Sequence, residues 1–345
     1  MSIEPRAFSF AGGRRKVVRQ SQDDLVRLGT LEGFGEFPLV LEPNTGDVSL
    51  ASWAAANRER IETLLLERGA LLFRGFRVDS IERFQEAARA VTPDLLDYKE
   101  RAAPRREVAS KVYTSTEFPA DQWIPLHHEM SYSRNWPAKL WFYCDQPAAE
   151  GGRTPIVDDR LILGRIRPEI QRPFLEKQVM YVRNYGEGVD LPWQQAFQTE
   201  DRAEVKAYCR KAGMELEWRG KDRLRTRTVR PATVTHPRTG VQLWFNHAHM
   251  FHVSNLDSGT RQVLLGQFAP DELPRNAFYG DGSPIPDEVL EEIRQIYRDA
   301  AVAFPWQRGD LLLLDNFLAS HGREPFVGPR RIVVAMAELY TEHAA

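Results

Sequence analysis

Three residues of the chain are of the types that hold a catalytic iron ion. His127 and Glu129 are separated by one residue, and His321 lies far downstream. In an extended segment alternate side chains share a face, so His127 and Glu129 point to one side and His128 to the other. Two imidazoles and one carboxylate on one face of Fe(II) leave the opposite face open for oxygen and a second ligand. The spacing predicts a non-haem iron oxygenase, although a histidine and a glutamate two residues apart also occur by chance on solvated loops.

The segment around His321 also supplies a cation. The apolar run at residues 310–314 predicts a strand that delivers His321 to its far end, and Arg331 begins a second apolar strand. A guanidinium inside an apolar barrel is costly unless it meets an anion, and its planar fork suits a carboxylate. A dicarboxylic cosubstrate supplies such an anion. Two alternatives stay open: Arg331 pairs with an internal acid, or the neighbouring Arg330 is the residue that faces inward.

A second group of histidines offers a rival metal site. His247 and His249 form an H-x-H pair, a pattern that holds zinc or iron when it lies on a strand, so a zinc-dependent hydrolase is the alternative from another class. A metal site of this type also requires a glutamate a few residues later, but the first acidic residue after the pair is Asp257. We therefore expect these histidines to line the substrate pocket. Asn246, at the end of an apolar strand, is the better candidate for a substrate contact.

Composition excludes several classes of function. The chain has 345 residues, 42% of them hydrophobic, which suffices for one enzyme-sized domain. Its 46 Lys and Arg against 48 Asp and Glu give a net charge of -2, so no overall field favours nucleic acid or an anionic membrane, and a small-molecule partner is expected. The two cysteines, Cys144 and Cys209, are too few for a disulfide framework, and no apolar run reaches membrane-spanning length. With no signal peptide at the N-terminus, these features predict a soluble, cytoplasmic protein.

The periodicity predicts helices outside a core of strands. Residues 1–30 have little periodicity and predict an irregular arm, and residues 31–345 predict a single domain with a long helical insertion at about 158–300. A helix over 51–68, a strand over 70–73 and a helix over 80–91 precede the histidine motif. Further strands are predicted at 140–145, 154–157, 179–185, 225–229, 242–246, 310–314 and 332–338, and further helices at 200–211, 254–268 and 286–299. The pattern predicts a sandwich-like barrel of the α+β class.

Several longer strings resemble one known family. His127-x-Glu129, Gly151-Gly152-x-Thr154-Pro155 and Asp315-Asn316 with His321-Gly322-Arg323 and Arg330-Arg331 are similar to the motifs of the Fe(II)/2-oxoglutarate-dependent taurine dioxygenase (TauD/TfdA) family, closest to its SyrP-like branch. The resemblance runs from about residue 71 to residue 338. Supporting strings are Tyr113-Thr114-Ser115-Thr116, Trp244-Phe245-Asn246-His247, Tyr279-Gly280-Asp281-Gly282-Ser283 and the run from Phe304 to Asp310.

The resemblance implies a double-stranded β-helix (jelly-roll) core and a set of site residues. It implies His127, Glu129 and His321 as iron ligands, with 2-oxoglutarate as cosubstrate and O2 as oxidant. It implies that Arg331 binds the distal carboxylate of 2-oxoglutarate together with Thr154. Most of the family carries aspartate where Glu129 stands, and the longer side chain is similar to that of clavaminate synthase-like members. Related halogenases replace this carboxylate with alanine or glycine, so Glu129 favours hydroxylation.

The branch resemblance also suggests a substrate class. It implies an amino acid or amino-acid-derived substrate, free or tethered to a carrier protein, in secondary (antibiotic) metabolism, and β-hydroxylation is the expected reaction. Desaturation, epoxidation or cyclisation on the same iron core, and a catalytically silent jelly roll that binds a small acid, are the alternatives. Neither the exact substrate nor the oligomeric state follows from the sequence. The candidate substrate-pocket residues are Tyr113, His128, Ser131, Arg134 and Asn246.

Overall fold

The largest element of the structure is a sheet of eight strands. The structure is a computed structural model, and it describes residues 25–97, 106–115, 118–186 and 191–342. The strands of the sheet run in the order β1-β2-β3-β16-β7-β19-β5-β4, and all its neighbours are antiparallel except β2 and β3. Their bounds are β1 (Val26–Gly29), β2 (Leu39–Pro43), β3 (Ala70–Phe73), β16 (Leu311–Asp315), β7 (Asn135–Gln146), β19 (Arg331–Thr341), β5 (Val112–Thr114) and β4 (Glu107–Ala109).

Both faces of this sheet are buried. On β16, Leu311 and Leu313 pack with the N-terminal helices, while Leu312 and Leu314 pack in the interior of the barrel. Strand β19 is divided in the same way between Val333, Ala335 and Ala337 on one face and Ile332, Val334 and Met336 on the other. Strands covered on both sides appear in the sequence as continuous apolar runs without a polar phase.

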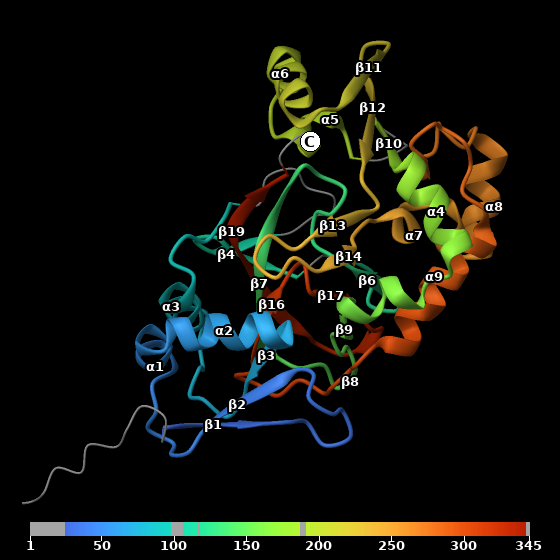
Figure 1. Ribbon diagram of the computed structural model, residues 1–345. Helices are drawn as coiled ribbons and strands as arrows, with labels where there is room; N and C mark the ends of the chain where they lie inside the picture. The colour runs from blue at the N-terminus through green and yellow to red at the C-terminus, as the bar shows by residue number, and fades with distance from the viewer. Residues whose placement is uncertain (1–24, 98–105, 116–117, 187–190, 343–345) are drawn as a thin grey trace, which may run out of the picture.

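Three N-terminal helices cover one face of the sheet, as Figure 1 shows. The single helix expected over residues 51–68 is in fact two, α1 (Leu50–Ala56) and α2 (Arg58–Arg68), separated at Asn57. Gly69 ends α2 in the left-handed conformation (φ 77°), and α3 (Ile81–Val91) begins after the predicted N-cap Ser80, whose hydroxyl accepts a hydrogen bond from the backbone N–H of Arg83.

A second, smaller sheet closes the barrel and carries the motif residues. It consists of β6 (Ile124–His127), β17 (Ala319–Arg323) and β9 (Ile156–Asp158) in the order β6-β17-β9, with the short pair β8 (Glu150–Gly151) and β18 (Phe326–Val327) beside it. Ile156 of β9 and Ala319 of β17 pack into the same apolar cluster as the inner face of the large sheet. Two sheets facing each other across one core form the expected jelly roll.

The chain between β9 and β16 contains strands as well as helices, so the predicted insertion is only partly helical. Four strands form an antiparallel sheet in the order β11-β12-β10-β15, and β13 pairs with β14. These strands are β10 (Val179–Tyr185), β11 (Glu215–Arg219), β12 (Arg223–Arg230), β13 (Thr233–Thr235), β14 (Gln242–Trp244) and β15 (Arg275–Tyr279). The helices are α4 (Pro168–Lys177), α5 (Trp193–Phe197), α6 (Arg202–Ala212), α7 (Ala248–Phe251), α8 (Ser258–Gln267) and α9 (Asp287–Ala300), with short 3-10 turns η2 (Asp159–Leu161), η3 (Leu163–Arg165) and η4 (Val253–Asn255).

The N-terminal arm expected over residues 1–30 lies mostly outside the described residues. Its last part is not irregular, because Val26–Gly29 forms β1 and pairs with β2. Among the helices of the described ranges, none combines the length and the apolar character that crossing a bilayer requires.

Candidate active site

Strands β6 and β17 bring the two histidines of the predicted triad together. In this antiparallel pair His127 lies directly opposite His321, and their ring centroids are 4.5 Å apart. Gly322 permits the close approach, because a Cβ at this position would lie 2.7 Å from the carbonyl oxygen of Ile124. Strand β17 is short and contains serine, histidine, glycine and arginine, so periodicity did not predict it.

Glu129 completes a cluster of three metal-type donors. It is buried, and its Oε2 lies 4.0 Å from Nε2 of His321. One ligand atom from each of His127, Glu129 and His321 lies within 4.8 Å of the others, a spacing that suits a single metal ion.

The tautomer of His127 also fits a metal. Its Nδ1 lies 2.7 Å from the carbonyl oxygen of Pro125, which can only accept a hydrogen bond, so Nδ1 carries the proton. Nε2 is then left with the lone pair that a metal ligand requires, and a metal-bound histidine commonly donates its other N–H in this way. The residues present therefore fit the iron ion that the motif implies.

His128 points away from this cluster, as strand parity predicted. Its side chain is fully buried against the ring of Phe245, and its Nε2 lies 3.3 Å from Oδ2 of Asp159. His128 does not line the pocket that His127 and His321 line, and its role toward a substrate stays a prediction. The contacts make it part of the support beneath the metal ligands.

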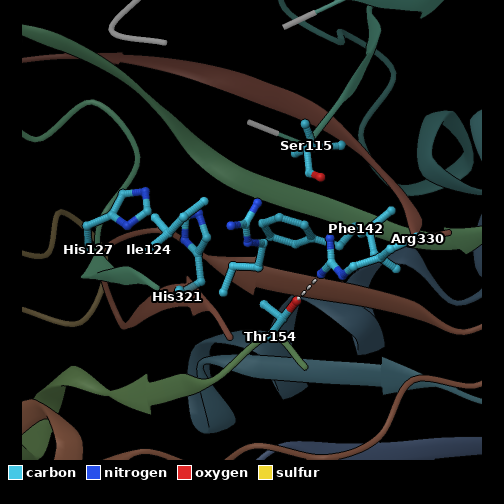
Figure 2. A pocket seen from close by; sticks show the side chains of 11 residues that line it. Ser115, Ile124, His127, Phe142, Thr154, His321 and Arg330 are labelled. Carbon is cyan, nitrogen blue, oxygen red and sulfur yellow. Dashed lines mark hydrogen bonds between the residues drawn. The ribbon is translucent and has the colours of Figure 1, made fainter. Parts of the chain in front are cut away.

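A pocket extends from the two histidines to an arginine and a threonine, as Figure 2 shows. Phe142 lines the pocket between these two ends. At the far end Nη2 of Arg330 donates a hydrogen bond to Oγ1 of Thr154 at 3.4 Å. One end thus offers metal ligands and the other a cation.

Burial and charge suit the far end of the pocket to an anion. Burial, together with the nearby positive charge of Arg323, lowers the pKa of Arg330 to about 10. Among the residues that the structure describes, no carboxylate forms a salt bridge with Arg330. Gly152 leaves room for the arginine stem, since a Cβ there would lie 3.0 Å from Cδ of Arg330, and its carbonyl oxygen accepts a hydrogen bond from Nε at 2.8 Å. A carboxylate ligand would supply the missing counter-charge.

The placement of Arg331 predicted from the sequence is wrong. Its side chain is 48% exposed, and Nη1 lies 3.1 Å from Oδ2 of Asp145 at the surface. Arg330 lines the pocket together with Ile332 and Val334, whereas Arg331 does not. The alternative left open by the sequence, in which Arg330 faces inward, is the one that the structure has.

Two further candidate substrate residues, Ser131 and Tyr113, differ in how they contact the rest of the site. Ser131 is buried with its Oγ 2.5 Å from Nδ1 of His247, whose ring lies 5.4 Å from that of His127. Tyr113 is buried on β5 in the apolar cluster that includes Phe142. Ser131 is therefore the candidate linked most directly to the ligand cluster.

Two candidates instead hold the backbone. The side-chain amide of Asn246 donates to the carbonyl oxygen of Ala232 at 2.9 Å and accepts from the N–H of Ala248 at 3.1 Å, so its predicted substrate contact stays a prediction. The half-buried Arg134 donates through Nε to the carbonyl oxygen of Glu342 at 3.1 Å, and its substrate contact stays a prediction as well.

The rival pair His247 and His249 does not form a metal site. The two residues lie at the start of the one-turn helix α7 and not on a strand. In a helix, side chains two residues apart point in different directions. Nε2 of His249 is 2.7 Å from the carbonyl oxygen of Leu126, and burial lowers the pKa of His249 to about 4. The zinc hydrolase alternative is not supported.

Arg323 lines the pocket, although the sequence motif that contains it predicted no role for this residue. It lies two residues after His321 on β17 and is buried in the pocket wall. Its guanidinium donates to the carbonyl oxygens of Phe118, Pro119 and Gln122, and burial lowers its pKa. Arg323 is two residues from His321 and would share its face on a strand, but the sequence did not predict that β17 is a strand.

Comparison with known sequences agrees with this geometry. The family described as "Taurine catabolism dioxygenase TauD, TfdA family" matches residues 36–336. The chain is 43% identical over 295 residues to the dapdiamide synthesis protein DdaC of Enterobacter agglomerans, covering 86% of this chain and 89% of that protein. It is 33% identical over 321 residues to a clavaminate synthase-like protein of Arabidopsis thaliana, covering 88% and 94%.

Solved structures support the fold. PvcB from Pseudomonas aeruginosa superposes with a TM-score of 0.54 at 18% sequence identity, covering 92% of this chain and 93% of that one. A second structure of PvcB, described as an Fe, alpha-ketoglutarate dependent oxygenase, gives the same TM-score and covers 93% and 95%. The matched length and the identity to its relatives show that the chain belongs to the TauD, TfdA family and is a dioxygenase that uses non-haem iron and 2-oxoglutarate.

Proposed function

We propose that this dioxygenase hydroxylates an unactivated carbon, the β-carbon in our first assignment, of an amino acid or amino-acid-derived substrate. The observation that carries the proposal is the intact donor cluster of His127, Glu129 and His321, whose ligand atoms lie within 4.8 Å of one another. A carboxylate at position 129 would take the place on the iron that a halide needs, which favours hydroxylation over halogenation.

In this proposal the two ends of the pocket have separate tasks. Nε2 of His127, the carboxylate of Glu129 and the imidazole of His321 hold Fe(II). Arg330 and Thr154 hold the distal carboxylate of 2-oxoglutarate, whose charge the buried guanidinium balances. When bound, the iron and the cosubstrate supply the oxidising chemistry, and the protein orients the substrate beside them and keeps water out.

The substrate class is supported by the most similar of the relatives described above. DdaC takes its name from dapdiamide synthesis and covers nearly the whole length of this chain. On that basis we propose a role in the biosynthesis of an amino-acid-derived metabolite, with the substrate either free or tethered to a carrier protein.

A binding screen under anaerobic conditions tests the substrate class. The protein is loaded with Fe(II) and 2-oxoglutarate, and free and carrier-tethered amino acids are added while the metal-to-ligand charge-transfer band is recorded. A substrate shifts this band. Admission of oxygen should then give succinate and a product that has gained one oxygen atom, as measured by mass spectrometry.

The outcomes separate the alternatives. A product that has lost two hydrogens and gained no oxygen would show that the reaction is desaturation and not hydroxylation. An oxygen gained at a double bond would indicate epoxidation. The His321→Ala variant should form no succinate, whereas Arg331→Gln should retain activity because Arg331 faces the surface. Full activity of His321→Ala would contradict the proposed metal site.

A further inference from the structure

The backbone of Glu129 is not fixed by strand pairing, unlike that of His127 and His321. Strand β6 ends at His127, so Glu129 lies outside the ladder that fixes the histidines. The next residue, Met130, has a φ of 61°, in the left-handed region that side chains other than glycine rarely adopt. A metal ligand at such a turn needs another constraint to point in one direction.

A single side chain supplies that constraint. Oδ1 of Asn316 accepts a hydrogen bond from the backbone N–H of Glu129 at 2.8 Å, and Nδ2 donates to the carbonyl oxygen of Glu129 at 3.0 Å. The second Nδ2 proton goes to the carbonyl oxygen of Pro137 at 2.8 Å, and the side chain is fully buried. Asn316 thus bonds both backbone groups of one residue, as a neighbouring strand would. It fixes the peptide planes on both sides of the Glu129 Cα and hence the direction of its side chain.

Asn316 is itself anchored to the elements that deliver His321. Its backbone N–H donates to the carbonyl oxygen of Ala138 on β7 at 2.8 Å. The preceding residue, Asp315, accepts hydrogen bonds from the N–H groups of Phe317 and Leu318 and so shapes the turn into β17. The carboxylate and the second histidine are therefore set by one connected segment.

We propose that Asn316 is a positioning residue for the metal carboxylate, acting through the backbone of Glu129. This inference rests on the proposed role of Glu129 as a metal ligand. Partners that orient metal ligands typically contribute about 10- to 100-fold to metal affinity. Because Asn316 touches neither substrate nor metal, its contribution should appear in metal binding before any turnover.

The test compares Asn316→Ala with a matched variant. Asn276 is also a buried asparagine whose amide holds backbone, accepting from the N–H of Val253 at 3.1 Å and donating to the carbonyl oxygen of Pro270 at 3.0 Å. It lies on β15, in the insertion, so Asn276→Ala removes similar bonds away from the donors. Both variants should lose stability in denaturant titrations.

Only one of the two variants should lose metal. The affinity of the metal-free protein for Co(II), read from its ligand-field absorption, is expected to fall about 10- to 100-fold in Asn316→Ala and to stay unchanged in Asn276→Ala. The absorption at saturating Co(II) should also change shape in Asn316→Ala. Equal affinities and spectra for wild type and Asn316→Ala would overturn the proposal and leave Asn316 a purely structural residue.

Two further measurements make the result decisive. If Asn316→Ala does not fold, amide hydrogen exchange of the metal-free wild type decides instead: the Glu129 N–H should exchange slowly, and exchange at the rate of an exposed loop would overturn the proposal. Glu129→Ala tests the ligand assignment by itself. Unchanged Co(II) affinity in Glu129→Ala would refute Glu129 as a ligand, whereas loss there with none in Asn316→Ala would refute only the positioning role.

Discussion

The guanidinium of Arg330 and the hydroxyl of Thr154 lie side by side at the end of the pocket away from His127 and His321, with Nη2 3.4 Å from Oγ1. The two residues are far apart in the sequence and meet because β8, which precedes Thr154, pairs with β18, which precedes Arg330. Together they present hydrogen-bond donors to the pocket, which is the arrangement that a carboxylate requires.

Replacement of Arg330 by glutamine should weaken 2-oxoglutarate binding. The change removes a charged donor whose counter-ion is expected from the cosubstrate, and hydrogen bonds to charged groups contribute about 1.5–3 kcal/mol. The KM for 2-oxoglutarate should therefore rise about 10- to 100-fold, measured as succinate formed.

The same substitution at the next residue is the control for Arg330→Gln. Arg331→Gln removes only the surface pair with Asp145, and exposed pairs contribute little, so the KM should stay within about twofold of wild type. A larger effect at Arg331 than at Arg330 would reverse our assignment of the two arginines.

The choice between these two arginines shows what the sequence could not reveal. Strand β19 is buried on both faces, so its apolar run carries no alternation from which to read which residues face the barrel interior. The pairing with β7 also shifts register between Arg331 and Ile332. Because the burial of both faces depends on tertiary packing, the direction of Arg330 could not be read from the sequence.

Other parts of the site were predictable because they depend on local patterns. The alternation expected for an extended segment correctly turned His128 away from His127, although β6 itself ends at His127, and the caps at Gly69 and Ser80 placed the helix ends. The rival H-x-H site could not be dismissed from the sequence, because the helical turn that begins after His247 has no strong local signal. The contacts of Asp159 with His128 and of Asn316 with Glu129 join residues far apart in the sequence, so no local pattern predicted them.

Loss of the Asp159 charge should destabilise the fold beneath the ligands. Oδ2 of this fully buried carboxylate lies 3.3 Å from Nε2 of His128 and accepts the N–H of Ser320 at 2.5 Å. In Asp159→Asn the new amide would either point its NH2 group at His128 or Ser320, or leave one of these two residues without an acceptor. Because removal of one partner of a buried pair is costly, we expect the free energy of unfolding to fall by about 3 kcal/mol in denaturant titrations.

The neighbouring carboxylate gives a comparison for Asp159→Asn. Asp158 pairs with the half-buried Arg160, so Asp158→Asn should cost about 1 kcal/mol or less. Adding His128→Asn to Asp159→Asn should then cost less than the two single changes combined. Strict additivity would show that the two side chains do not interact.

The insertion should become less stable at mildly acidic pH because of His252. Burial lowers the pKa of His252 to about 4 from an ordinary value of 6.5; Asp287 opposes this shift, and Arg294 and Arg261 add to it. Its Nδ1 accepts the backbone N–H of Ser254 at 3.1 Å, a bond that requires the neutral ring.

The sign of the effect follows from proton uptake. Between pH 6.5 and about 4 the unfolded chain binds a proton that the folded chain does not, so the contribution is complete above about pH 6.5 and is lost as the pH falls to about 4. The loss is about 3 kcal/mol for the whole shift. In denaturant titrations across this range, His252→Gln should show a shallower fall of stability with pH than wild type, and parallel curves would contradict the assignment.

Trp306 should tune the affinity for 2-oxoglutarate through Thr154. Its Nε1 donates to Oγ1 of Thr154 at 3.0 Å, so Trp306 and Arg330 together engage both acceptor positions of the hydroxyl. The hydroxyl proton is then left to point toward the pocket as a donor. Trp306→Phe keeps the aromatic contact with Phe304 but removes this N–H. Because one neutral hydrogen bond contributes about 1 kcal/mol, the KM for 2-oxoglutarate should rise about fivefold with little change in kcat. In Thr154→Val the same tryptophan substitution should have no further effect, since the hydroxyl that it orients is gone; an undiminished effect there would mean that Trp306 acts on the pocket by packing alone.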